Sequence, residues 1–182
     1  VLPGFFSENI RVDNHAMNGR SSKSYIDEGR WDKVLSLIKK GDYVFIQFGH
    51  NDEKVDEKRH TDPGSTFDAN LRRFVKETRA KGGIPVLFNA IVRRNFRNNK
   101  NAVAEDDVRK DLSKGSVSQD GEVLIDTHGK YLESPRNVAK ELDVSFVDMN
   151  KITHDLVQRM GPEASKKLFM WIPEGVCAAC PK

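Results

Sequence analysis

The sequence predicts an α/β fold in which a parallel sheet carries helices on both of its faces. Short apolar runs alternate with amphipathic segments along the 182 residues, at the spacing of strand–helix–strand units. The clearest strand lies at 43–48, an apolar run that only Gln47 interrupts, and such a run indicates a strand buried on both faces. At this length we expect a single domain covering 1–182.

The segment before this strand is predicted to be a helix that ends at Gly41. Apolar side chains three and four residues apart define its buried face: Trp31, Val34, Leu35 and Ile38. Lys39 and Lys40 precede Gly41, and cations are favoured at the carboxyl end of a helix, where glycine often ends it. Further upstream, residues 10–16 indicate a weak strand and residues 17–22 a loop.

A second helix and strand are predicted after a strongly charged surface loop at 53–64. Residues 65–68 resemble a capping box, with aspartate in place of the usual glutamate. The buried face of the helix is expected to consist of Phe67, Leu71, Phe74 and Val75. The helix should end at Gly82, and an apolar run at 84–92 should form the next strand, with Pro85 tolerated only near its start.

The remaining third of the chain should add another strand and further helices. Residues 93–118 are basic, rich in asparagine and without a clear period, so we predict an irregular segment there. Ser134 and Pro135 suit the first positions of a helix, which leaves the start of the third helix open by about a turn. The elements expected after the irregular segment are an extended piece at 123–125, a helix ending near 142, a strand at 144–149, a helix through 152–160 that Gly161 and Pro162 close, and a short helix at 162–169.

Two predicted loops, at 18–21 and 49–52, carry residues suited to ester chemistry. Both follow strands, and ligands of open α/β sheets bind at the carboxyl ends of strands. Gly19 allows close approach of the backbone and offers its N–H, whereas Asn51 offers an amide that can hold a developing oxyanion without carrying charge. The alternative is that Asn51 and Asp52 merely form an Asx turn.

The ordered set of motifs resembles the rhamnogalacturonan acetylesterases of the SGNH (GDSL-like) hydrolase superfamily. The resemblance begins with Asn-His-Ala-Met-Asn-Gly-Arg-Ser at 14–21 and includes the segment 42–52, which ends in Gly-His-Asn-Asp. It continues, over nearly the whole chain, at 29–31, 85–87, 92–94, 126–129, 147–150 and 167–170. The resemblance implies a three-layer α/β/α sandwich around a parallel sheet, a flavodoxin-like SGNH hydrolase fold.

The resemblance also implies roles for individual residues. A serine nucleophile of the family is activated by a histidine that an aspartate orients. Gly19 and Asn51 match the residues that donate to the oxyanion. His50 and Asp52 match supporting residues that shape their loop. Arg20 and Ser21 match a family loop that could touch the substrate. This chemistry requires no metal and no cofactor, and we find no convincing set of metal ligands in the sequence.

The chain departs from the family at its catalytic blocks. A Gly-Asp-Ser block and an Asp-x-x-His pair are both absent, so we expect an incomplete domain lacking the first strand and the C-terminal catalytic loop. An internal triad would have to combine Ser21, Ser22 or Ser24 with His128 and Asp126 or with His154 and Asp155. His154 and Asp155 are adjacent in a predicted helix, where neighbouring side chains point about 100° apart. The segment at 126–129 matches a family segment that is not catalytic.

The resemblance predicts that the parent protein is a carbohydrate O-acetylesterase acting on acetylated pectic rhamnogalacturonan, as a monomer, secreted or periplasmic. The alternative is a non-catalytic carbohydrate-binding relative or an inactive fragment. A net charge of +3 without a basic stripe argues against nucleic acid, and no apolar run is long enough to cross a membrane. Cys177 and Cys180 lack the further ligands of a zinc site, which leaves a loop without chemistry or a disulfide.

Overall fold

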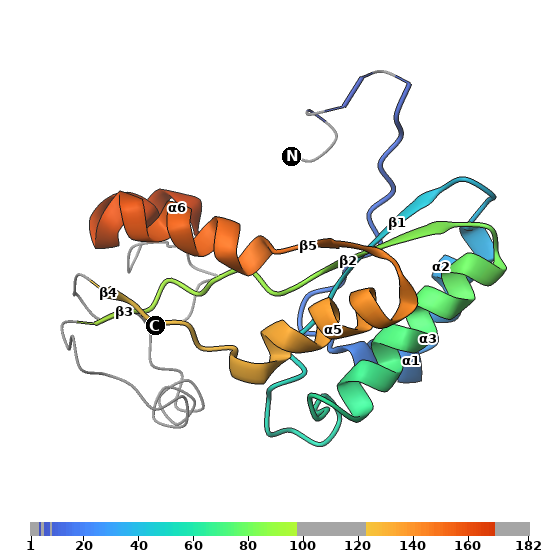
Figure 1. Cartoon of the computed structure of the whole chain (residues 1–182), viewed down its shortest axis with the longest axis horizontal. Helices are drawn as coiled ribbons and strands as arrows, with labels where there is room; N and C mark the ends of the chain where they lie inside the picture. The colour runs from blue at the N-terminus through green and yellow to red at the C-terminus, as the bar shows by residue number, and fades with distance from the viewer. Residues whose placement is uncertain (1–3, 5, 8, 98–122, 170–182) are drawn as a thin grey trace, which may run out of the picture.

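A parallel sheet forms the centre of the computed structural model, which describes residues 4, 6, 7, 9–97 and 123–169. Its strands lie in the order β1 (Tyr43–Gln47), β2 (Ile84–Phe88) and β5 (Ser145–Val147), and both pairings are parallel (Figure 1). The predicted α/β class with a parallel sheet is thereby confirmed.

The central strand, β2, is shorter than the predicted run to residue 92. Pairing with β5 begins at Val86, one residue beyond Pro85, which has no N–H to donate. The strand ends where the side chain of Asn89 takes over the hydrogen bonding. Its Nδ2 donates to Asp148 Oδ1 (2.8 Å), and its Oδ1 accepts from the Asn150 N–H (2.8 Å). Asn89 thus ties the end of β2 to the residues that follow β5.

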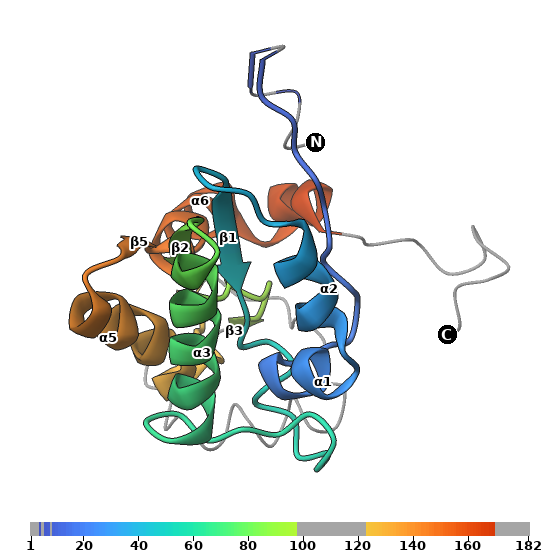
Figure 2. The same cartoon turned by 90° about the vertical axis from the view of Figure 1, so that its right-hand side faces the viewer.

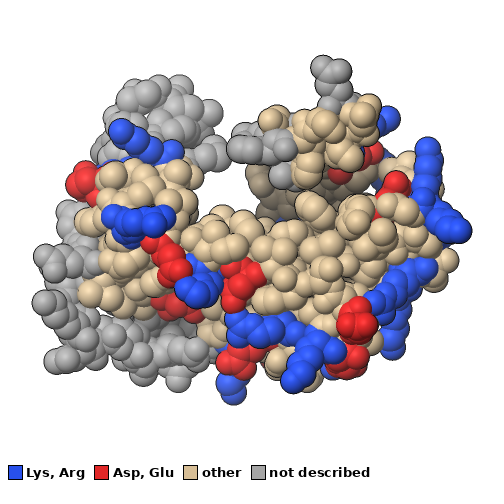
Figure 3. All heavy atoms as spheres, turned by 45° about the horizontal axis from the view of Figure 1, so that its top comes forward, with Lys and Arg blue, Asp and Glu red and all other residues tan. Residues whose placement is uncertain are grey.

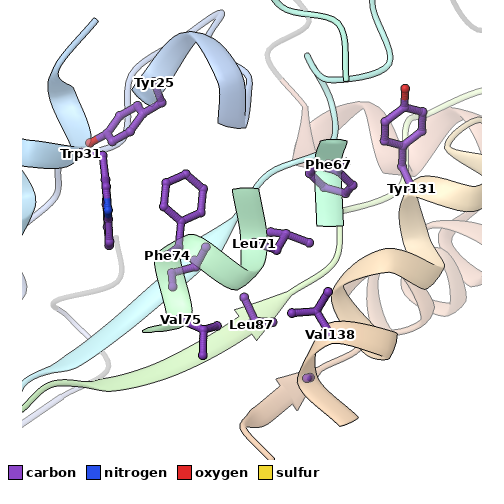
Figure 4. Packing of buried hydrophobic residues seen from close by; sticks show 11 residues of the cluster. Tyr25, Trp31, Phe67, Leu71, Phe74, Val75, Leu87, Tyr131 and Val138 are labelled. Carbon is purple, nitrogen blue, oxygen red and sulfur yellow. The ribbon is translucent and has the colours of Figure 1, made fainter. Parts of the chain in front are cut away.

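Four helices cover one face of the sheet: α1 (Ser22–Asp27), α2 (Arg30–Leu37), α3 (Thr66–Ala80) and α5 (Glu133–Leu142) (Figure 2). A short 3-10 helix, η2 (Gly129–Leu132), leads into α5. The four apolar residues predicted for α3 are all fully buried in this core (Figure 4). Phe74 stands at its centre, with its ring 4.7 Å from Trp31 and 5.2 Å from Phe48 between centroids. The helical period therefore identified this face correctly.

The other face of β1 is open in the described part of the chain. Tyr43 is 69% exposed and Phe45 is 51% exposed, so the prediction of burial on both faces is wrong for this strand. The Phe45 ring packs on its neighbour on the sheet, Phe88, at 5.1 Å between centroids. Uncharged residues cover the middle of the face in Figure 3, and charged residues lie along its lower and right-hand edges and on the lobe at the left.

A second, smaller core lies under α6 (Met149–Ala164). Val157 packs there with Val92, in the segment after β2, and with residues of the antiparallel pair β3 (Phe96–Arg97) and β4 (Val123–Leu124). β4 confirms the predicted extended piece at 123–125, whereas β3 begins within the segment predicted to be irregular. Gly161, with φ +75°, interrupts α6 directly before Pro162, as predicted, and η3 (Ser165–Leu168) follows.

Two local predictions are wrong. Residues 10–16 form no strand, because no described strand lies beside them to complete a ladder. Ser65 makes no side-chain capping bond, and Asp68 instead accepts from the Gly64 N–H (2.8 Å). Cys177 and Cys180 lie outside the described residues. Within the described ranges, every helix is too short or too polar to cross a bilayer.

Candidate active site

The two predicted loops meet at the carboxyl end of β1, and the buried carboxylate of Asp52 joins them. Asp52 is fully buried and accepts from the Ser22 N–H at both oxygens (3.0 and 3.1 Å). It also accepts from the Ser22 hydroxyl (2.5 Å), the Thr61 hydroxyl (2.9 Å) and the Gly49 N–H (3.1 Å). One side chain therefore fixes the loop after β1 against the amino end of α1.

The ionisation of Asp52 reflects this burial. Burial raises the pKa of Asp52, because a carboxylate loses hydration in the protein interior. Hydrogen bonds from Ser22, Thr61 and Gly49 oppose the increase by stabilising the charged form. The Asp52 carboxylate accepts five hydrogen bonds from four donor groups, which belong to Ser22, Thr61 and Gly49, and it therefore holds these segments together.

Asn51 lies directly against the loop that contains Gly19. Its Nδ2 donates to the Arg20 carbonyl oxygen (3.2 Å), and among the described residues its second N–H has no partner. The Gly19 N–H is also without a partner in the described chain, and the residue is exposed with φ +76°, a conformation that favours glycine. The structure thus brings the two residues together, and their role as oxyanion donors stays a prediction.

Arg20 and Ser21 both make contacts within the protein, and the substrate contact of their loop stays a prediction. The Arg20 guanidinium is paired with Glu28 (Nε to Oε2 3.0 Å) and also donates to the Asn18 carbonyl oxygen. Ser21 is fully buried, and its hydroxyl caps α1 by accepting from the Ser24 N–H (3.1 Å). Ser21 is therefore a helix cap rather than a side chain available to a substrate.

The His50 ring packs edge-on against that of His128, with ring centroids 4.5 Å apart. Burial, followed by the positive charges of His128, Arg93 and Lys54, lowers the pKa of His50 from 6.5 to about 3. The ring is consequently neutral near pH 7. This state suits the supporting role predicted for His50 better than a role in proton transfer.

This lowered pKa makes folding stability depend on pH. Between about pH 6.5 and pH 3 the unfolded chain binds a proton at His50 that the folded chain does not bind. The stabilisation is complete above pH 6.5 and is lost as the pH falls towards 3. We expect His50 to contribute a loss of roughly 2–3 kcal/mol in the free energy of unfolding between pH 7 and pH 4, measured by urea titration.

His50→Gln provides the control, because glutamine cannot gain this proton. Asp52 has the opposite effect on the pH dependence of stability. Because its pKa is raised in the folded chain, its contribution to the free energy of unfolding is lost as the pH rises. The informative quantity is therefore the difference between wild type and His50→Gln at each pH. Parallel losses of stability in the two proteins between pH 7 and pH 4 would show that His50 titrates normally in the folded chain.

Sequence reasoning missed a cluster behind the loop, formed by Glu53, Arg93 and His128. Glu53 forms an ion pair with Arg93, and the Nδ1 atom of His128 lies 3.0 Å from Glu53 Oε2. His128 is fully buried, and its Nε2 atom lies 2.9 Å from the Ile91 carbonyl oxygen. The motifs at 92–94 and 126–129 were the only signal in the sequence, and they did not show that these segments meet Glu53.

The internal triads considered from the sequence are not formed. Among the described residues no serine hydroxyl is hydrogen-bonded to a histidine, and Ser22 is bonded to Asp52 and Asn70. His154 Nδ1 lies 3.9 Å from Asp155, beyond hydrogen-bonding distance. No grouping of three or more potential metal ligands occurs in the part of the chain that the structure describes.

A polar hollow of about 450 Å³ extends along the same edge of the sheet, beyond the ends of β2 and β5. Its walls carry side chains of both charges together with neutral amides, among them Asn89, Asp126, Arg136, Asp148, Asn150 and His154. The edge that presents Asn51 therefore continues into a surface rich in hydrogen-bonding groups.

Comparisons with known proteins show which family this chain belongs to. A family model described as the GDSL-like Lipase/Acylhydrolase family matches residues 2–168. Rhamnogalacturonan acetylesterase RhgT of Bacillus subtilis is 38% identical over 94% of the chain, and the match spans 63% of that relative. The probable rhamnogalacturonan acetylesterase YesY of the same species is 28% identical over 96% of the chain and is matched over 70% of its length.

A solved structure shows the same fold. The crystal structure of the protein YxiM from Bacillus subtilis superposes with a TM-score of 0.70 at 22% identity, over 93% of this chain and 41% of that one. At this identity the likeness concerns the fold alone. The chain thus spans less than two thirds of RhgT and less than half of YxiM.

Proposed function

Because the chain belongs to the GDSL-like lipase/acylhydrolase family, we propose that the whole protein is a serine esterase that removes acetyl groups from pectic rhamnogalacturonan. The observation that carries this proposal is the 38% identity to a rhamnogalacturonan acetylesterase across 94% of the chain. A second relative, with 28% identity, carries the same activity in its name. A polymeric substrate of this kind also favours a site of action outside the cytoplasm.

The geometry supports the same reaction class. Attack on an acetyl ester produces a tetrahedral intermediate whose oxygen carries negative charge, and neutral N–H donors stabilise it without adding repulsion. The second N–H of the Asn51 amide and the Gly19 N–H are such donors, and neither has a partner among the described residues. The polar hollow beyond β2 and β5 offers hydroxyl-binding groups for neighbouring sugars.

The test is acetate release by the whole protein from acetylated rhamnogalacturonan, followed by chromatography. We expect release from this polymer and slower release from acetylated xylan at equal acetyl concentration. The 182-residue chain serves as the control, and we expect no release from it, because no described serine is paired with a histidine. Binding of the polymer by the whole protein without any release would favour the non-catalytic carbohydrate-binding alternative.

A further inference from the structure

We propose that Arg93 is a positioning residue that holds the Asn51 amide in place for the esterase reaction. The inference rests on the proposed function, because it assigns Arg93 a role in the same site. Arg93 follows the end of β2 and reaches across to the loop after β1. Its Nη2 donates to the carbonyl oxygen of His50 (3.1 Å), which belongs to the peptide bond directly preceding Asn51.

The other contacts of Arg93 fix the direction in which it donates. Its Nη1 donates to the Thr127 hydroxyl (3.1 Å) and forms the ion pair with Glu53. The Glu53 side chain is only 10% exposed and that of Arg93 only 21% exposed, so solvent competes little for these bonds. A planar guanidinium can make these contacts in several directions at once, which a single ammonium group cannot.

His128 packs against Glu53 and His50 and limits the movement of this cluster. The ring is fully buried between the Glu53 carboxylate and the Ile91 carbonyl oxygen, and His50 packs edge-on against it. The loop after β1, the segment after β2 and the segment before η2 therefore meet in one cluster. A shift of Arg93 would release the His50 carbonyl from this cluster.

Asn51 consequently lies between two anchors. Asp52, on one side, ties the loop to the amino end of α1, whereas Arg93, on the other, ties it to the end of β2. Hydrogen-bond donors stabilise a transition state only when they are held at the correct position, and a displacement of about 1 Å can lower the rate by about 10²-fold. Loss of Arg93 should therefore slow turnover while leaving ground-state binding of the polymer largely intact.

Kinetics of the whole protein provide the first test. We expect both Arg93→Met and Arg93→Lys to lower kcat for acetyl release at least tenfold, with KM changed less than about twofold. Lysine keeps the positive charge beside Glu53, so this variant should fold even if Arg93→Met does not. Arg94→Met is the matched control, because Arg94 donates instead to Pro162 O (3.0 Å) and Ser165 Oγ (3.2 Å), and we expect wild-type kcat.

A double-mutant cycle separates positioning from a general loss of structure. If Arg93 acts through Asn51, the Arg93→Lys substitution should have almost no further effect on kcat in an Asn51→Ala background. Fully additive losses would overturn the inference. A normal kcat in Arg93→Lys would also overturn it, whereas a normal kcat in Asn51→Ala would instead refute the assigned site.

Nuclear magnetic resonance of the 182-residue chain tests the inference without any enzymatic activity. In Arg93→Lys we expect the side-chain amide resonances of Asn51 to shift or broaden, while those of Asn70 stay unchanged. In Arg94→Met the Asn51 resonances should stay unchanged. Unchanged Asn51 resonances would contradict the positioning role even if the whole protein proved to have no esterase activity.

Discussion

Replacement of Asn51 by alanine is expected to lower kcat for acetyl release by the whole protein about 10²–10³-fold, the loss typical of one oxyanion donor. The amide offers one N–H that no described residue uses, beside the unpartnered Gly19 N–H. KM should change little, because the lost interaction forms mainly in the transition state. Initial rates of acetate release over a range of polymer concentrations provide both constants.

Stability measurements control for damage to the fold. Among the described residues the Asn51 side chain makes a single hydrogen bond, to the Arg20 carbonyl oxygen, so its loss should cost only about 1 kcal/mol of unfolding free energy. Asn51→Asp should be at least as slow as alanine, because a carboxylate would repel the oxyanion. Near-normal kcat in both variants, with the fold intact, would remove Asn51 from the reaction.

The sequence contains enough information to locate Asn51 and Gly19, but not to determine what surrounds them. A short apolar run followed by Gly-His-Asn-Asp places the loop at a strand end, which is a local property. The contacts of Arg93 and His128 with Glu53 join segments tens of residues apart, and no periodicity reports them. Residues 53–64 were predicted to be a charged surface loop, although Glu53 is almost buried.

Burial of the sheet was misjudged for a related reason. The run at 43–48 has the composition of a strand covered on both faces, and composition does not show which partner covers each face. In the described chain the helices pack only on the side of Val44 and Ile46, which leaves Tyr43 and Phe45 exposed. Helix α3 was easier to predict, because its buried face follows from spacing alone.

Asp52→Ala should be among the most destabilising substitutions in the chain, at about 3–5 kcal/mol of unfolding free energy. Alanine leaves the backbone N–H groups of Ser22 and Gly49 and the hydroxyl of Thr61 without their acceptor, in a place that water does not reach. Each unsatisfied buried donor costs about 1–3 kcal/mol, and shared relaxation makes the sum smaller than the parts. Urea unfolding followed by circular dichroism measures the loss.

Asp62→Ala is the matched control, because Asp62 follows in the same loop, its side chain is 65% exposed, and its partner among the described residues is His60. We expect that substitution to cost less than about 1 kcal/mol. Asp52→Asn should cost an amount of unfolding free energy between those of the two alanine variants. The amide keeps one acceptor oxygen, but its NH2 group faces donors that need an acceptor. If Asp52→Ala were no less stable than Asp62→Ala, the carboxylate would not be holding the two loops together, and the placement of Asn51 would need another cause.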